Sequence, residues 1–208
     1  MTKEQIRRII LDTRIVPVVR AQSAQLALSA AEAVTAGGIP IVELTMTVPG
    51  AIDAIATLSR RTGGKVLIGA GTVLDAATAQ ECLDAGAQFL VSPGFDAETV
   101  KLANRTGTLM MAGALTPTEV LTAWKAGADF VKIFPAGNVG GPSYIKALKA
   151  ALPPVPMIPT GGVNLNTAAA FLTAGASALG IGGELISGDA ASIMERARQY
   201  LAIIREVQ

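Results

Sequence analysis

The sequence of 208 residues contains no histidine. This absence excludes Ser-His-Asp and Cys-His nucleophiles, and it argues against the usual catalytic zinc sites, which rely on imidazole ligands. Any acid–base chemistry must therefore fall to carboxylates, lysine, tyrosine or cysteine.

Cysteine is almost as scarce, since Cys82 is the single one in the chain. One cysteine excludes an internal disulfide and is typical of a reducing compartment, so we expect a cytoplasmic protein. Cys82 falls on a predicted helix, and we interpret it as a packed thiol without a redox role.

The chain also lacks an excess of charge of either sign and a long apolar run. Its 17 basic and 16 acidic residues nearly cancel, whereas nucleic-acid binding needs a basic face, so we expect no nucleic-acid partner. Gly, Pro or charge interrupts the apolar stretches well short of the ~18 residues of a membrane span. The charged opening stretch, MTKEQIRRIILDTRIV, does not have the pattern of a signal peptide.

What the sequence has instead is a high apolar content. Half of the residues are hydrophobic and only 16% are charged, which indicates a sheet buried on both faces, a large subunit interface, or both. No linker or low-complexity segment divides the chain. We therefore predict a single domain over residues 1–208.

Short apolar, β-branched segments recur along the chain and alternate with amphipathic stretches, which predicts strands alternating with helices. Eight such units close most naturally into a (β/α)8 TIM barrel, with an extra helix over roughly residues 3–12 covering the bottom. The alternative is an open doubly wound sheet, but no GxGxxG motif follows the first strand. The predicted strands are 15–19, 39–44, 65–71, 88–93, 108–113, 129–135, 155–162 and 177–183.

Helix ends carry recognisable signals as well. Ala-Gly pairs precede four of the strands, and their glycines suit the left-handed cap at the end of a helix: Gly37, Gly86, Gly127 and Gly175. At helix starts we expect N-caps at Asp75, Asn164 and Thr116, the last in a capping box with Glu119.

Lys132 lies in the middle of the apolar segment DFVKIFP. Alternation along this strand places Phe130, Lys132 and Phe134 on the inner face of the barrel. Glu43, on the inner face of the second strand, and Arg20, at the end of the first, come to the same end, where barrel enzymes carry their chemistry.

A lysine is rarely buried without a reason, because removing an ammonium from water is expensive. Burial favours the neutral amine, which is the form that attacks a carbonyl to give a Schiff base. Glu43 could move the protons that this chemistry requires. The alternative is a structural Lys132–Glu43 ion pair that fixes the register of the strands.

Glycine-rich turns end three of the strands: IGAGTV (68–73), PTGGVN (159–164) and GIGGEL (180–185). The last two follow the seventh and eighth strands, where many barrels hold a phosphate on backbone N–H groups. These turns predict a phosphate site.

With these residues in place, the sequence resembles the 2-keto-3-deoxy-6-phosphogluconate (KDPG) aldolase family, which also includes 4-hydroxy-2-oxoglutarate (KHG) aldolases. The resemblance covers nearly the whole chain. It rests on the motifs VVRAQS (18–23), VELTMTVPGA (42–51), IGAGTV, FLVSPGFD (89–96), GALTPTE (113–119), VKIFPA (131–136), PTGGVN and GIGG.

The resemblance implies a class I aldolase that cleaves KDPG to pyruvate and glyceraldehyde 3-phosphate without metal or cofactor. Lys132 would be the Schiff-base lysine and Glu43 the general acid/base. The substrate would contact Arg20, Thr72 and Thr47 at its carboxylate, Pro93 and Phe134 at the pyruvate wall, Thr160 beside the imine, and Gly161, Gly162, Gly182 and Gly183 at its phosphate. The resemblance also implies a homotrimer.

Two departures from the family bear on the substrate. Some members have an arginine where this chain has Thr47, so carboxylate binding would depend more on Arg20. Other members have a serine at the position of Glu184, where its hydroxyl meets the phosphate. A carboxylate pointing at a phosphate would be repulsive, so unless Glu184 turns outward, a smaller or unphosphorylated substrate such as KHG is favoured. The remaining alternative to an aldolase is a non-catalytic barrel that binds a phosphorylated metabolite. Such a protein would not need a buried imine-forming amine.

Overall fold

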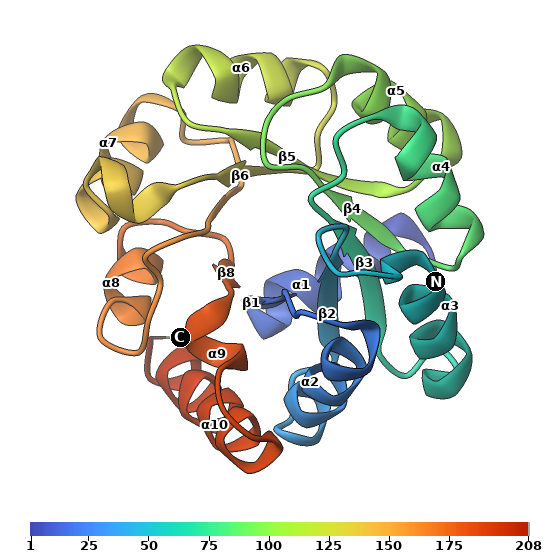
Figure 1. Cartoon of the computed structure of the whole chain (residues 1–208). Helices are drawn as coiled ribbons and strands as arrows, with labels where there is room; N and C mark the ends of the chain where they lie inside the picture. Colours follow the sequence, from blue (N-terminus) through green and yellow to red (C-terminus); the bar gives the residue numbers. More distant parts are fainter. Residues whose placement is uncertain (208) are drawn as a thin grey trace.

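A computed structural model describes residues 1–207, and its centre is an eight-stranded parallel sheet curved into a barrel (Figure 1). Every strand is buried along its whole length, as expected for a parallel sheet with helices outside and packed side chains inside. The strands are β1 (Ile15–Val19), β2 (Ile41–Thr45), β3 (Leu67–Gly71), β4 (Phe89–Val91), β5 (Leu109–Ala114), β6 (Phe130–Ile133), β7 (Met157–Pro159) and β8 (Leu179–Ile181).

The strands follow one another around the barrel in chain order, and β8 returns to pair with β1. The last junction, between β7 and β8, is the least complete. An isolated bridge between Thr160 and Gly180 joins the two strands, and the amide of Ser177 donates to the carbonyl of Met157 at 2.9 Å. The predicted (β/α)8 barrel is confirmed, with a seam between β7 and β8.

The helices form an outer ring around the strands (Figure 1). None of those within residues 1–207 is long and apolar enough to cross a membrane. The helices are α1 (Lys3–Thr13), α2 (Ala24–Ala36), α3 (Ala51–Thr62), α4 (Ala76–Asp84), α5 (Ala97–Thr106), α6 (Pro117–Lys125), α7 (Pro142–Ala151), α8 (Ala168–Thr173), α9 (Gly183–Ile186) and α10 (Ala190–Val207), with a 3-10 helix at Ala136–Val139.

Helix α1 covers the bottom of the barrel, as the sequence predicts. Lys3 pairs with the carboxylate of Asp129 at 2.9 Å, and Arg7 donates to the backbone carbonyl of Asp129 at 3.0 Å. The guanidinium of Arg7 also lies 5.0 Å from the ring centroid of Phe130, at the start of β6. These contacts fix α1 beneath β6.

The helix caps agree with the sequence at most positions. Asp75 accepts a hydrogen bond from the amide of Thr78, and Thr116 and Glu119 form the capping box. Asn164 has the hydrogen bonds of the predicted N-cap, because its side chain accepts from the amides of Asn166 and Thr167 and its carbonyl accepts from the amide of Ala168. The regular part of α8 nevertheless begins only at Ala168, with Thr167 before it.

The prediction of a left-handed cap at Gly37 is wrong by one residue. Gly37 has a φ of −73° and Gly38 has a φ of +102°. Gly37 is needed for a different reason, because a side chain there would collide with Ala197 and with the carbonyl of Met194 in α10. Gly86, Gly127 and Gly175 have the expected positive φ.

Candidate active site

A lysine and a glutamate meet inside the barrel. The Nζ atom of Lys132 on β6 lies 3.7 Å from Oε1 of Glu43 on β2, and their side chains are only 7% and 2% exposed. β6 lies between β5 and β7, with Lys132 in register with Gly113 and Ile158. Side chains point alternately into and out of the barrel along each strand. Lys132 and Glu43 both point inward, from strands on opposite sides of the ring, and therefore meet.

Burial raises the pKa of the Glu43 carboxyl, and the positive charges of Lys132 and then Arg20 act in the opposite direction. Although the pair is within ion-pair distance, its 3.7 Å separation is longer than the ~2.7–2.9 Å of a charge-assisted hydrogen bond. Oε1 of Glu43 is buried without a hydrogen-bond partner. The effect of desolvation on the Glu43 pKa therefore outweighs that of the nearby positive charges. A carboxyl with a raised pKa is suited to accept and donate a proton.

The space for the Glu43 side chain is provided by Gly71 at the end of β3. A Cβ atom at Gly71 would overlap Oε1, Cδ and Cγ of Glu43. Gly71, in the motif IGAGTV, thus makes room for the Lys132–Glu43 pair, in addition to its place before a turn.

Phe134 follows β6 directly and lies beside the lysine. Its ring centroid is 5.5 Å from Nζ of Lys132, and the residue is 36% exposed. Its amide donates to the carbonyl of Ala114 at 3.1 Å, which holds the backbone at the barrel mouth. Phe134 is thus an apolar wall between Lys132 and solvent.

A cavity of about 500 Å3 opens next to this wall, at the seam between β7 and β8. Its lining contains seven of the predicted site residues, which are Arg20, Phe134, Thr160, Gly161, Gly162, Gly182 and Gly183. Glu184 of α9, whose side chain is exposed, lines the same cavity. The structure thus places the two glycine turns on either side of one cavity.

The turn after β7 depends on its glycines. Gly161 and Gly162 have φ of +83° and +79°, the left-handed region that favours glycine. A side chain at Gly162 would also press against Gly137 of the 3-10 helix. Thr160 is 7% exposed, and its amide donates to the carbonyl of Ile133 at 2.9 Å, so it lies at the base of the cavity.

Five predicted site residues lie outside this cavity lining: Lys132 and Glu43, which are buried inside the barrel, and Thr72, Thr47 and Pro93. Thr72 follows β3 with a φ of +57°, an uncommon conformation for a residue with a side chain. Thr47 shares a 2.8 Å hydrogen bond with the buried hydroxyl of Thr45. The backbone of Pro93 packs closely against Gly113 of β5. Thr47, Thr72 and Pro93 each belong to a loop that follows the carboxyl end of β2, β3 or β4.

The cavity also contains residues for which the sequence analysis gave no substrate role. Asn164 and Ile186 line it, the first from the turn after β7 and the second from the end of α9. Asn164 is the last residue of PTGGVN, whereas Ile186 directly follows GIGGEL. Asn164 was thus contained in a predicted motif but considered only as a helix cap, and extending GIGGEL by one residue would have identified Ile186.

Within residues 1–207, no three His, Cys, Asp or Glu side chains are grouped so that they could hold a metal ion. The polar groups of the predicted site are the amine of Lys132, the carboxyl of Glu43, the guanidinium of Arg20, threonine hydroxyls and backbone amides.

The profile of the family described as KDPG and KHG aldolase matches residues 6–200. The chain belongs to the KDPG and KHG aldolase family. It is an aldolase, and hence a lyase.

Individual relatives agree with this assignment. A 2-dehydro-3-deoxy-phosphogluconate aldolase of Treponema pallidum is 35% identical over 197 residues, covering 92% of this chain and 93% of the relative. The crystal structure of the KDPG aldolase of Zymomonas mobilis ATCC 29191 superposes with a TM-score of 0.88 at 28% identity, and all of both chains is covered.

A third aldolase of the family was crystallised with a reaction intermediate. The KDPG aldolase of Legionella pneumophila, with pyruvate captured as a covalent carbinolamine, matches with a TM-score of 0.80 at 28% identity over 96% of each chain. The family resemblance deduced from the motifs is confirmed by all three comparisons.

Proposed function

We propose that this aldolase cleaves KDPG to pyruvate and glyceraldehyde 3-phosphate through a Schiff base on Lys132. The observation that carries the proposal is the buried amine of Lys132, 3.7 Å from the buried carboxyl of Glu43 and beside a glycine-lined cavity. The names of the relatives in Treponema pallidum and Zymomonas mobilis support the choice of substrate.

The reaction begins with attack of the Lys132 amine on the C2 ketone of the substrate. Glu43 protonates the oxygen that leaves as water when the carbinolamine becomes an imine, and its raised pKa suits it to this acid role. The carbinolamine trapped in the Legionella pneumophila aldolase is the corresponding adduct of pyruvate in that protein.

Bond cleavage follows from the charge on the imine. The protonated imine withdraws the electron pair of the C3–C4 bond, while Glu43, directly or through a water, accepts the proton of the C4 hydroxyl. An aldehyde leaves and an enamine remains on Lys132. Protonation of the enamine at C3 and hydrolysis then release pyruvate, so that the atoms and protons balance without a cofactor.

The remaining site residues hold the two ends of the substrate. Arg20, Thr72 and Thr47 bind the carboxylate of the pyruvate half, and Pro93 and Phe134 exclude water around the imine, with Thr160 beside it. Arg20 lies at the mouth of the cavity, and its charge reaches Glu43. The phosphate binds between the two glycine turns, on backbone amides of Gly161, Gly162, Gly182 and Gly183.

KHG is the second candidate substrate, and Glu184 is the observation that favours it. Its carboxylate at the edge of the cavity repels a phosphate dianion if it points inward. Comparing kcat/KM for KDPG and KHG decides between them. A ratio well above one supports KDPG, and a ratio well below one supports KHG.

We also propose that the protein is a cytoplasmic homotrimer with one domain over residues 1–208. Several large apolar side chains are exposed, including Leu26 at 56% and Leu74 at 63%, and subunit contacts would cover such groups. Light scattering coupled to gel filtration tests this. The expected mass is three times that of the chain, and a mass of one chain would contradict the trimer.

Borohydride trapping tests the central step. Pyruvate and borohydride should convert the protein to a stable adduct, and peptide mapping should place it on the peptide that carries Lys132. Lys132→Ala should abolish the adduct and turnover, while the exposed control Lys146→Ala keeps both. An adduct that persists in folded Lys132→Ala, or no adduct in folded wild type, overturns the proposal.

A further inference from the structure

Two donor groups on α10, the helix that packs against α9, are buried. The Nη2 atom of Arg196 and the hydroxyl of Tyr200 are both shielded from solvent and have no hydrogen-bond partner. Buried polar groups are normally paired, so each such exception calls for an explanation. The two residues are four apart, on the same face of one helix.

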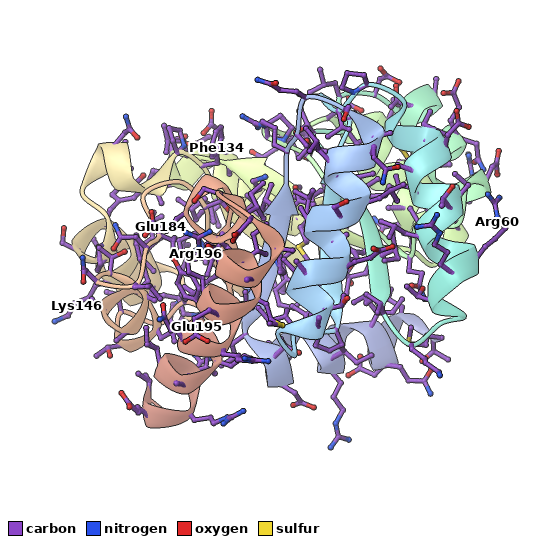
Figure 2. The ribbon with its side chains drawn as sticks, turned by 60° about the horizontal axis from the view of Figure 1, so that its bottom comes forward. Arg60, Phe134, Lys146, Glu184, Glu195 and Arg196 are labelled. Carbon is purple, nitrogen blue, oxygen red and sulfur yellow. The ribbon has the colours of Figure 1, made fainter. Side chains whose placement is uncertain are left out.

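This face of α10 contacts α9, which carries Glu184 in its first turn. The Nε atom of Arg196 donates to the carbonyl of Leu185 at 3.3 Å. Figure 2 shows Glu184 and Arg196 on these two neighbouring helices. The Arg196 guanidinium is thus hydrogen-bonded to the backbone of Leu185, the residue directly after Glu184, while its Nη2 atom has no partner among the described residues.

The carboxylate of Glu184 is close enough to influence this face of α10. Burial raises the pKa of the Tyr200 hydroxyl most strongly, the Glu184 charge raises it further, and Arg196 opposes them. In the structure of residues 1–207, however, no salt bridge joins Glu184 to Arg196. Glu184 is exposed and borders the cavity, and within the described part of the chain its carboxylate is not held by a neighbouring charge.

We propose that Arg196 and Tyr200 form a receptor for the Glu184 carboxylate, which docks on them when a phosphorylated substrate enters the cavity. The inference rests on the proposed function, because it is the substrate phosphate that displaces Glu184. Docking pairs both buried donors and removes a negative charge from the edge of the phosphate site. Arg196 and Tyr200 are therefore positioning residues that determine whether the site accepts a dianion.

A double-mutant cycle with two substrates tests this arrangement. Arg196→Met keeps an unbranched side chain but removes the charge, so Glu184 stays near the phosphate. We expect KM for KDPG to rise about tenfold with kcat little changed, and both constants for KHG to stay near the wild-type values. Arg198→Met is the matched control, because Arg198 is exposed on the same helix and pairs with Glu195.

The second arm of the cycle isolates the charge of Glu184. In a Glu184→Gln background, the effect of Arg196→Met on KM for KDPG should shrink below about twofold, since no carboxylate remains to dock. Equal effects of Arg196→Met in both backgrounds, or on both substrates, overturn the proposal. A wild-type enzyme that does not cleave KDPG refutes the proposed function itself, and the docking inference with it.

Tyr200→Phe provides a test that does not depend on the folding of Arg196→Met. It removes one donor and leaves the ring that packs in the core. We expect KM for KDPG to rise about two- to threefold, again without an effect on KHG and without an effect in the Glu184→Gln background. An unchanged KM for KDPG in folded Tyr200→Phe removes Tyr200 from the receptor.

Discussion

The Cα atom of Gly71 lies directly against the side chain of Glu43, so that a methyl group added to Gly71 would overlap the carboxylate. Glu43 has 2% of its surface exposed and cannot move into solvent to make room. The position of Glu43, the proposed general acid/base, is therefore set by a residue that has no functional group of its own.

Gly71→Ala is expected to lower activity by displacing Glu43 from Lys132. Overpacking a core typically destabilises a protein by about 1–3 kcal/mol, and misplacing a catalytic group can lower kcat by about 10²-fold. Urea unfolding and steady-state kinetics measure the two effects. Gly94→Ala is the control, because a methyl group there meets no atom within 4 Å. Full activity of Gly71→Ala would show that Glu43 tolerates another position.

The Lys132–Glu43 pair should reduce stability relative to an apolar pair. Removing one partner leaves an uncompensated buried charge, which costs roughly 3–5 kcal/mol, whereas replacing both by apolar residues is often neutral or stabilising by about 1–4 kcal/mol. We expect Lys132→Met/Glu43→Leu to be inactive and at least as stable as the wild type. A free energy of unfolding well below that of the wild type would instead support a structural ion pair.

The contact of α1 with the bottom of the barrel should matter for stability and not for catalysis. Arg7→Ala removes the cation–π contact with Phe130 and the bond to Asp129, at a cost of about 1–2 kcal/mol with kcat unchanged. Arg8→Ala is the control, because Arg8 is 82% exposed and forms only a long pair with Asp12. Equal free energies of unfolding for the two variants would contradict the role of Arg7.

Cys82 should resist alkylation in the native protein. Its thiol is buried, and burial raises its pKa to about 11, so at neutral pH little thiolate is present to react. Iodoacetamide at pH 7.5 should label Cys82 within minutes in guanidinium and barely at all without it, as read by intact mass. Labelling of the native protein should increase as the pH approaches 11. Rapid labelling at pH 7.5 would show that the helix around Cys82 opens readily.

The sequence predicted the barrel and the inner face of β6 because both depend on patterns within one segment. Alternation placed Lys132 inside, and the same reasoning on β2 placed Glu43 there. Their distance, and the raised pKa of Glu43, depend on how strands from opposite sides of the ring approach each other. No single segment encodes that approach.

The errors have the same origin. The Gly-Gly pair at the end of α2 gave no sign of which glycine adopts positive φ, because the contact of Gly37 with α10 joins residues that are far apart in the chain. Asn164 makes the hydrogen bonds of an N-cap, as predicted, but the turn that it caps becomes a regular helix only at Ala168, a boundary that the sequence signal did not locate. The surroundings of Glu184 likewise depend on α10, which packs against α9.

The seam between β7 and β8 links substrate binding in the proposed site to the stability of the barrel. The glycine turns on its two sides belong to strands that are joined by one isolated bridge and one further backbone bond. In the proposed site, a phosphate bound by both turns would add a connection between the two strands where the barrel has the fewest backbone hydrogen bonds. Binding of the substrate would then stabilise the barrel at this junction, and release of the phosphorylated product would remove that stabilisation.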